Sequence, residues 1–406
     1  MPTTVRLRWD GQAGGFGETA KTFLYDAFVP DPIASIDPSF PLSDAEEAAA
    51  AERSIRELGT QPSLGGLEAL SRQLLRAESV ASSRIEGLAL SHRRLARATL
   101  DPDGTDRTAR SVVGNIEAMD AAVALGAGSV ALTVPDLLGI HARLFAGTEM
   151  ERFGGRLRDR QNWIGGSSLS PRKAEFVPPP PELVPELMED LCRFVARVDV
   201  PAVVQAAIVH AQFETIHPFV DGNGRVGRAL VHIVLRRRGT VSRYVPPVSL
   251  VLLANGRAYV EGLTMYRAGG IAAWSTRFAH ALTDSVALAA TLGRELNELQ
   301  EQWRAAAGAP RRTSATHRLI DLLAARPVLD IPSVAELLAV SYPQAREAVL
   351  RLEEAGVLRQ VLVGRKRNRA WEAPSLLDLL DAFEFEAMTP TRTGEPRRTT
   401  RRPKRA

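Results

Sequence analysis

Residues 217–228 constrain the fold of this chain most, because a glycine-rich turn there separates two strongly apolar stretches with helical periodicity. The first stretch covers residues 201–216 and ends at Pro218, since proline cannot continue a helix. The second stretch resumes the helical period over residues 225–238. The glycine-rich segment is therefore expected to be a loop between two packed helices.

Helical periodicity also dominates the rest of the chain before residue 304. We expect helices over residues 67–86, 111–125, 134–145 and 182–196, after an extended, proline-containing lead-in over residues 1–60 with a helix-like stretch beginning near Ser43. Residues 160–177 combine aromatic, β-branched and glycine residues in the manner of a β-hairpin, which a polyproline spacer ends. The predicted fold class is mainly α with one small β-hairpin.

The C-terminal quarter has a different texture. Residues 305–315 are small, basic and contain Gly and Pro, which is typical of a linker. Three short helices over residues 317–325, 334–339 and 343–355 precede two short strands over residues 359–363 and 369–371. This order predicts a winged helix-turn-helix domain over residues 316–385. Residues 386–406 lack an apolar period and predict a disordered basic tail.

Composition limits the partners of the chain. No apolar stretch is long enough to cross a bilayer, and residues 1–17 lack the apolar block of a secretory signal, so we expect a cytoplasmic protein without membrane contact. The single cysteine, Cys192, excludes an intrachain disulfide. The net charge is +4, but residues 391–406 hold seven Lys and Arg against one Glu, so the basic charge belongs to the tail.

The glycine-rich loop has the physical properties of a phosphate site. Gly222, Asn223 and Gly224 precede a helix N-terminus, where unpaired backbone N–H groups and the helix dipole favour an anion. Since both glycines lack a side chain, the backbone can approach that anion closely. Arg225 and Arg228 share one face of the following helix, so they can grip two phosphates of one nucleotide.

Two further side chains add chemistry to this cradle. Asp221 is a hard oxygen ligand suited to Mg²⁺, which bridges phosphates. His217 belongs to the residue type that titrates near neutrality, so it can take a proton from an incoming hydroxyl. One histidine before a proline, or one Gly-Asn-Gly turn, is usually structural. A turn alone does not require a histidine, an aspartate and two arginines together, so the combination indicates a functional site.

Residues 217–228 match the full Fic-family pattern HPFx[DE]GNGRxxR, and the chain resembles that family over roughly residues 20–300. The resemblance implies a helical catalytic core over residues 106–304, an N-terminal Fic-associated helical region over residues 1–105, and protein AMPylation. It implies that His217 deprotonates a Ser, Thr or Tyr hydroxyl of a target protein. That hydroxyl would attack the α-phosphate of ATP and release pyrophosphate.

The resemblance also implies roles for other residues. Asp221 would hold Mg²⁺, Asn223 and the loop amides from Gly222 to Gly224 would steady the α-phosphate, and Arg225 and Arg228 would take the β- and γ-phosphates. Doc-like relatives that transfer a terminal phosphate carry Lys in place of Gly224, so Gly224 favours AMP transfer. Tyr259 would be a ring wall for adenine. Residues 164–177 resemble the family's flap, which aligns an extended target segment; the alternative is a simple cover for the core.

Residues 82–87 fit a second pattern of the family, [ST]xxxE[GN]. Ser82 and Glu86 share a helix face, which alone would indicate only a solvated polar face. Beside the Fic loop, the resemblance implies an inhibitory helix over about residues 67–87 whose Glu86 pairs with Arg228 and occupies the clamp for the γ-phosphate. Glu86 can also serve the removal of AMP by orienting a water molecule, as in some relatives, and the sequence does not decide this point.

The winged helix leaves its partner open. Arg351 and the wing residues Arg365, Lys366, Arg367 and Arg369 favour DNA, whereas Glu347, Glu353 and Glu354 would repel phosphates, so protein docking or dimerisation is favoured over DNA. The main prediction is an autoinhibited protein adenylyltransferase that uses ATP and Mg²⁺ and modifies a target protein or itself. The alternatives are a nucleotide-sensing, DNA-binding regulator and a Fic enzyme that uses another nucleotide or removes AMP.

Overall fold

The computed structural model describes residues 2–11, 21–38, 40–60, 67–101, 104, 106–167, 169–241, 244–363 and 368–389. The helices and strands in chain order are β1 (Thr3–Trp9), β2 (Phe23–Val29), α1 (Leu42–Thr60), α2 (Leu67–Ile85), α3 (His92–Ala98), α4 (Arg107–Gly126), α5 (Val134–Phe145), α6 (Val184–Val195), α7 (Ala202–Ile216), α8 (Asn223–Arg237), α9 (Val248–Ala254), α10 (Gly256–Arg267), α11 (Ile271–Ala306), α12 (Ala315–Ala325), β3 (Val328–Leu329), α13 (Ile331–Leu338), α14 (Tyr342–Glu354), β4 (Arg359–Val363), β5 (Asn368–Glu372) and α15 (Pro374–Met388). The mainly helical prediction is confirmed. No helix in these ranges combines the length and the apolar character that crossing a membrane requires.

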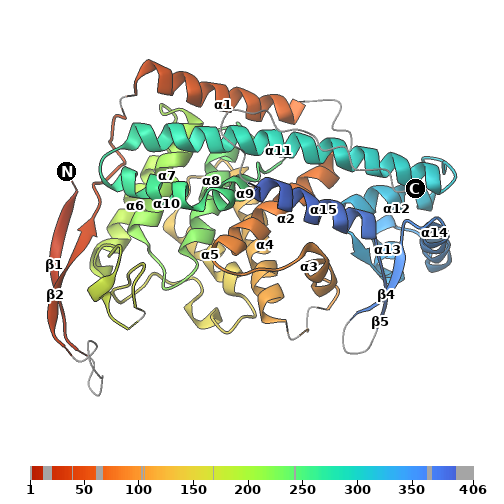
Figure 1. The fold of residues 1–406 in the computed structure, drawn as a ribbon, viewed down its shortest axis with the longest axis horizontal. Helices are drawn as coiled ribbons and strands as arrows, with labels where there is room; N and C mark the ends of the chain where they lie inside the picture. The colour runs from red at the N-terminus through yellow and green to blue at the C-terminus, as the bar shows by residue number, and fades with distance from the viewer. Residues whose placement is uncertain are drawn as a thin grey trace.

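The centre of the helical body is the antiparallel pair α7 and α8 (Figure 1). Every residue of α7 is buried, because a helix that is apolar on nearly all sides needs neighbours all round. α6, α8, α10 and α11 supply those neighbours. The 36-residue α11 runs along the whole body, with α1 beside it. The loop between α7 and α8 is thus held by the most deeply packed helices of the protein.

The N-terminal 60 residues differ from the predicted extended lead-in. β1 and β2 pair as an antiparallel hairpin, with Val5 opposite Ala27, at one end of the molecule (Figure 1). Val5, Leu7 and Trp9 alternate with Arg6 and Arg8 along β1, but most residues of the strand are exposed, so this alternation does not mark a buried face. The hairpin docks on the helical body, since the backbone N–H of Phe28 donates to the carbonyl of Val177 over 2.9 Å.

The chain reversal expected over residues 164–177 is present in reduced form. A single antiparallel bridge joins Ile164 and Phe176, in which the Ile164 N–H donates to the Phe176 carbonyl over 2.8 Å. Gly165 and Gly166 both adopt positive φ at the turn, a conformation that glycine adopts without strain. The small hairpin is therefore confirmed, without the regular strands that its name suggests.

The C-terminal part has the element order of a winged helix: α12, β3, α13, α14, β4 and β5, with an antiparallel sheet in the order β3-β5-β4. The sequence did not predict β3 or α15. α15 continues to Met388, beyond the predicted domain end at residue 385, and packs on α3, α9 and α11. The predicted linker is shortened, because α11 continues to Ala306. The wing residues Arg365, Lys366 and Arg367 and the tail residues 390–406 lie outside the described residues.

Helix α2 ties these parts together through buried polar contacts. The Glu78 carboxylate accepts hydrogen bonds from the backbone N–H of Ser249 (2.7 Å) and its hydroxyl (2.6 Å), and lies 3.0 Å from Nε2 of His232. Glu78 and His232 are fully buried. One carboxylate therefore joins α2 to α8 and α9.

Removing this carboxylate should destabilise the protein. The Glu78→Ala variant leaves the buried donors of Ser249 without an acceptor, and we expect a loss of about 2–4 kcal/mol in the free energy of unfolding, measured by urea denaturation. Glu57→Ala, an exposed position on α1, is the matched control and should change stability by less than about 0.5 kcal/mol. Equal effects of the two substitutions would show that the Glu78 contacts contribute nothing to stability.

Candidate active site

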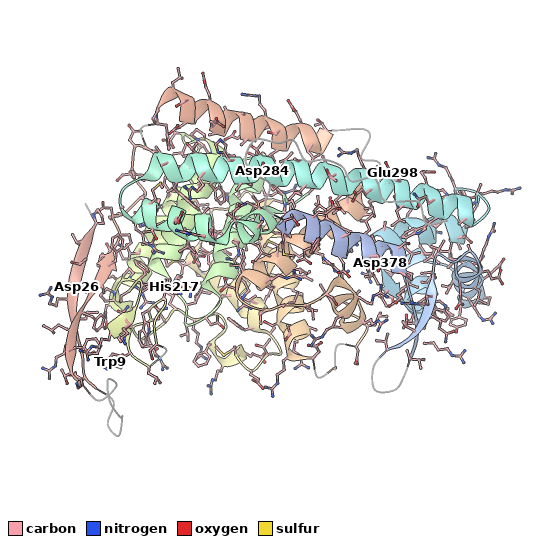
Figure 2. The ribbon with its side chains drawn as sticks, in the orientation of Figure 1. Trp9, Asp26, His217, Asp284, Glu298 and Asp378 are labelled. Atoms are coloured by element: carbon pink, nitrogen blue, oxygen red, sulfur yellow. The ribbon has the colours of Figure 1, made fainter. Side chains whose placement is uncertain are left out.

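The loop after α7 begins with a histidine in an unusual backbone conformation. His217 caps α7 in the left-handed region, with φ 50° and ψ 60°, which turns the chain sharply out of the helix. Phe219 is fully buried behind the loop. His217 lies in the part of the helical body nearest the β1–β2 hairpin (Figure 2). The loop therefore starts from a fixed point at a buried helix end.

Asn223 holds the loop in its shape. Its side-chain oxygen accepts from the Phe219 N–H over 2.8 Å, and its amide nitrogen donates to the Phe219 carbonyl over 2.9 Å. Both polar atoms of this buried side chain are thus used within the loop. The sequence assigned Asn223 to a phosphate, whereas its side chain here stabilises the turn that presents the backbone N–H groups of α8.

Two side chains that the sequence did not single out support the same loop. Arg158 is buried, and its guanidinium donates to the carbonyl of His217 over 2.9 Å and to the carbonyl of Pro179 over 2.5 Å. His141 stacks on Phe219 with ring centroids 3.7 Å apart. Its Nδ1 accepts from the Gly155 N–H, so its Nε2 carries the proton and donates to the Asp221 carbonyl over 3.0 Å. These contacts fix both ends of the loop from outside.

The imidazole of His217 is held in its neutral form. Burial lowers its pKa to about 4, and the positive charge of Arg158 acts in the same direction. Glu86 and the backbone of Glu214 oppose the shift but do not outweigh burial. At neutral pH the ring therefore carries no charge and has a lone pair available for a proton.

Asp221 and Arg225 form the open edge of the loop. The Asp221 side chain is half exposed, and its Oδ1 accepts from the Gly222 N–H over 2.6 Å and lies 3.6 Å from Nη2 of Arg225. Arg225 is buried, donates to the Ser111 hydroxyl over 3.2 Å, and lies over the ring of Phe145. These contacts engage only Oδ1 of the carboxylate, and half of the side chain is exposed.

Arg228 lies deeper and is bound by Ser82 of α2 and by Glu86, which follows that helix. Its Nε donates to the Ser82 hydroxyl, one terminal nitrogen donates to the Ser82 carbonyl, and the same nitrogen donates to Oε1 of Glu86, each over 2.8 Å. The guanidinium is 1% exposed, whereas the Glu86 side chain is 35% exposed. Burial alone would raise the pKa of Glu86, but the charge and hydrogen bond of Arg228 outweigh it and lower that pKa.

Glu86 also occupies the space over the N-terminus of α8. A Cβ atom built on Gly224 would overlap Oε1 of Glu86 and would come within 2.8 Å of a terminal nitrogen of Arg228. Gly224 is the second residue of α8, where free N–H groups and the helix dipole attract an anion. A carboxylate therefore stands in the position that the sequence assigned to a phosphate.

Glu214 is a further buried carboxyl group near this pair. It lies on the last turn of α7, its Oε1 has no hydrogen-bond partner among the described residues, and a Cβ on Gly227 would come within 2.5 Å of it. Burial raises its pKa to about 7, Arg228 opposes the shift, and Glu86 adds to it. The sequence did not single out Glu214, because a glutamate inside an apolar helix has no local pattern that marks it.

Tyr259 lies in the core. Its side chain is 8% exposed, its hydroxyl is 2.9 Å from Nε2 of His210, and its ring lies 6.4 Å from that of Trp274. These contacts account for the residue structurally, and its role against adenine stays a prediction. The structure thus brings together His217, the loop to Arg228, and the pair Ser82 and Glu86, and places Tyr259 behind them.

The arrangement suits a bound anion with a metal ion. The half-exposed Asp221 carboxylate offers a single oxygen donor, and the described residues hold no group of three His, Cys, Asp or Glu side chains that would enclose a metal. Mg²⁺ is commonly held by one or two carboxylates together with substrate phosphates, so this donor set fits a Mg²⁺ ion that arrives with a nucleotide. The neutral imidazole, the α8 N-terminus and two arginines complete a site that can bind phosphates and accept a proton.

Comparisons with known proteins agree with this geometry. Residues 131–235 match the Fic/DOC family, and residues 45–124 match the Fic/DOC family N-terminal region. A probable protein adenylyltransferase of Aquifex aeolicus is 36% identical over 99 residues, which are 24% of this chain and 28% of that protein. A protein adenylyltransferase of Caenorhabditis elegans is 29% identical over 133 residues, 32% of this chain and 23% of that protein. The chain thus spans about a quarter of the length of these curated relatives.

A solved structure extends the likeness of the fold. The crystal structure of a Fic family protein from Desulfovibrio desulfuricans has a TM-score of 0.54 and 22% sequence identity, and the alignment covers 83% of this chain and 98% of that one. The matched regions contain the whole glycine-rich loop and residues 82–87 at the end of α2. The chain thus contains a Fic/DOC domain over residues 131–235 and a Fic/DOC N-terminal region over residues 45–124.

Proposed function

We propose that this protein is an autoinhibited protein adenylyltransferase, which transfers AMP from ATP to a Ser, Thr or Tyr hydroxyl of a target protein or of itself. The names of the curated relatives support the class of reaction. The proposal concerns the reaction and its brake.

The position of Glu86 carries the proposal. Its carboxylate lies against Gly224 at the N-terminus of α8 and accepts from Arg228 over 2.8 Å. A helix N-terminus with an adjacent guanidinium is a phosphate site by charge and by hydrogen-bond geometry. A carboxylate in that position satisfies the same donors and excludes a phosphate group from them. Binding of the terminal phosphate of ATP therefore requires Glu86 to leave.

The reaction assigns a task to each charged group. His217 takes the proton of the acceptor hydroxyl, whose oxygen bonds to the α-phosphorus as the bond to the β-phosphate oxygen breaks and pyrophosphate leaves. The N–H group of Gly224 at the N-terminus of α8 holds a phosphate oxygen, and Arg225 and Arg228 hold the departing phosphates. Mg²⁺ bound by Asp221 would neutralise phosphate charge. Asn223, Arg158 and His141 keep the loop rigid.

The pKa of about 4 for His217 applies to the protein without a bound nucleotide. A triphosphate brings several negative charges close to the imidazole, and a nearby negative charge favours the protonated ring. Nucleotide binding therefore raises the pKa of His217 from about 4 toward the range in which a histidine accepts a proton efficiently. The base is thus weak in the inhibited state and stronger with its substrate.

The proposed brake, Glu86, can be tested by substitution. In the Glu86→Gly variant, Arg228 keeps its hydrogen bonds to Ser82 but loses the carboxylate that competes with phosphate. We expect the rate of AMP transfer to rise about 10- to 100-fold, the range given by one hydrogen bond between charged groups. The measurement is incorporation of label from ATP labelled at the α-phosphate into protein, either the chain itself or a lysate.

The Glu86→Gly and His217→Ala double variant is the control, and it should show no transfer while still binding ATP. Equal transfer rates in the wild type and in Glu86→Gly would show that Glu86 does not inhibit the reaction. Label that persists in the double variant would remove His217 as the base. If the AMP label disappears from the Glu86→Gly protein on longer incubation, but not from the wild type, AMP removal does not require Glu86.

Proton binding by His217 gives a further prediction. Because burial and Arg158 disfavour the charged ring, its NMR signals in the ligand-free protein should titrate with a pKa of about 4 instead of the ordinary 6.5. The unfolded chain binds this proton at higher pH than the folded chain, so the contribution of His217 lowers stability as the pH falls from about 6.5 to about 4. The His217→Gln variant identifies the signals. A titration at 6.5 or above would contradict the buried, neutral state.

A further inference from the structure

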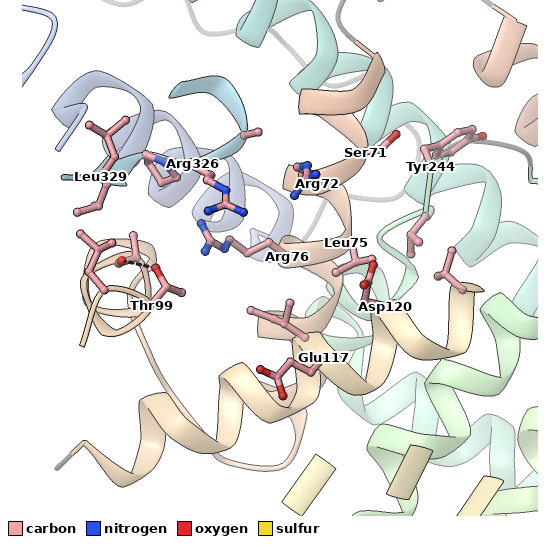
Figure 3. A pocket seen from close by; sticks show the side chains of 18 of the residues that line it. Ser71, Arg72, Leu75, Arg76, Thr99, Glu117, Asp120, Tyr244, Arg326 and Leu329 are labelled. Atoms are coloured by element: carbon pink, nitrogen blue, oxygen red, sulfur yellow. Dashed lines mark hydrogen bonds between the residues drawn. The ribbon is translucent and has the colours of Figure 1, made fainter. Parts of the chain in front are cut away.

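A hollow lies beside α2, between the helical body and the C-terminal part (Figure 3). It has a volume of about 600 Å³, and its walls come from α2, α3, α4 and the segment from Ala325 to Leu329. Arg76 on α2 is ten residues before Glu86, which corresponds to about 15 Å along the helix. The hollow is therefore separate from the site at the α8 N-terminus.

Two arginines face each other in this hollow without a carboxylate between them. Figure 3 shows the guanidinium groups of Arg76 and Arg326 next to one another, with Arg72 nearby on α2. Among the described residues, no acceptor lies within hydrogen-bond distance of one terminal nitrogen of Arg76, although that atom is buried. Burial and, to a smaller extent, the like charge of Arg326 together lower the pKa of Arg76 to about 10. This part of the hollow lacks a negative charge.

In a neighbouring hollow, several arginines are paired with carboxylates. Arg93 and Arg97 both pair with Glu372, at 2.6 and 2.7 Å, and Arg94 pairs with Asp106 at 2.5 Å. Buried or half-buried charges in proteins normally have such partners, because removing them from water is costly. The Arg76 and Arg326 pair is thus an exception within its own surroundings, and an exception of this kind marks a site that receives its anion from outside.

The remaining walls indicate the size and character of that anion. Leu75, Ile116 and Val123 give the hollow an apolar side, whereas Glu117 and Asp120 project from α4 as exposed hydrogen-bond acceptors (Figure 3). A volume of about 600 Å³ is in the range of small-molecule sites. Two guanidinium groups suit the oxygens of a phosphate, and the acidic wall suits hydroxyl or amino groups at the other end of the ligand.

We propose that this hollow binds an organic phosphate of about mononucleotide size, with its phosphate between Arg76 and Arg326 and its hydroxyl or amino groups toward Glu117 and Asp120. The site lies on the helix that carries Ser82 and Glu86 but shares none of the residues proposed for catalysis. The proposal does not depend on the AMP-transfer reaction.

The first measurement is binding by calorimetry to the full-length protein, with AMP, ribose 5-phosphate and inorganic pyrophosphate as separate probes. We expect at least one probe to bind the wild type and the Arg225→Gln variant equally, and to bind Arg76→Met and Arg326→Gln at least about tenfold more weakly, since each loses one charged hydrogen-bond donor. Arg312→Gln, an exposed arginine outside the hollow, is the matched control and should bind like the wild type. Binding that is lost in Arg225→Gln but kept in Arg76→Met would place the probe in the glycine-rich loop and overturn the proposal, as would the absence of binding by all three probes.

The second measurement is the melting temperature without a ligand. A ligand site made of two facing arginines is strained when empty, so Arg76→Met should raise the melting temperature by about 1–3 °C while weakening the binding of the probe. A structural role of Arg76 would give the reverse, a lower melting temperature. If Arg76→Met does not fold, the same comparison with Arg326→Gln, whose side chain is exposed, decides the point.

Discussion

The buried guanidinium of Arg228 is the constraint on which the site depends. A cation that is 1% exposed cannot be left without an anion, because desolvation would cost several kcal/mol. Ser82 supplies two neutral acceptors, and Glu86 supplies the charge. Glu214 lies close enough to act electrostatically, but its own burial raises its pKa to about 7, so it supplies only part of a negative charge at neutral pH. Arg228 therefore needs an anion from one of two sources, Glu86 or a bound phosphate.

The proposed exchange of Glu86 for a phosphate requires that α2 is held in place while the Glu86 side chain can move. Glu78 joins α2 to α8 and α9, the Asn115 amide donates to the Ser79 carbonyl over 2.8 Å, and the Gln73 amide donates to the Ala324 carbonyl over 2.8 Å. At the last turn, Arg84 forms an ion pair with Glu384 of α15 at 3.1 Å. Glu86 comes just after the helix ends, at its half-exposed margin. Its carboxylate can therefore move by side-chain rotation while the rest of α2 keeps its contacts.

Short-range signals allowed much of the fold and of the loop to be predicted from the sequence. Helix α5 was predicted over residues 134–145 and is found at Val134–Phe145, because a capping box at Thr133 and a proline in its first turn mark its start locally. The loop from His217 to Arg228 is a contiguous pattern. The pair of Glu86 and Arg228 spans 142 residues and was predicted only because a second family pattern points to it.

What escaped prediction is held by contacts between distant segments. The carbonyl groups around Arg158 belong to His217, Pro179 and Arg160, so no local spacing marks this arginine. The β1–β2 hairpin has no continuous buried face, and Tyr259 lies in the core because α7 and α11 cover it. Asn223 is the instructive case, since its partner Phe219 is only four residues away. An asparagine that shapes a turn and one that binds a ligand at that turn have the same spacing in the sequence. Only the structure distinguishes the two roles.

Gly224 shows why the proposed brake and a bound phosphate would exclude each other. The space that a Cβ would take at this residue is already filled by Oε1 of Glu86, and a terminal nitrogen of Arg228 lies 2.8 Å from the same point. A side chain at this residue would take the room that Oε1 of Glu86 fills, next to the N–H groups at the start of α8 that attract an anion. The absence of one side chain thus creates a volume for a single anion. Competition between carboxylate and phosphate then follows from the size of that volume and needs no change in the helices around it.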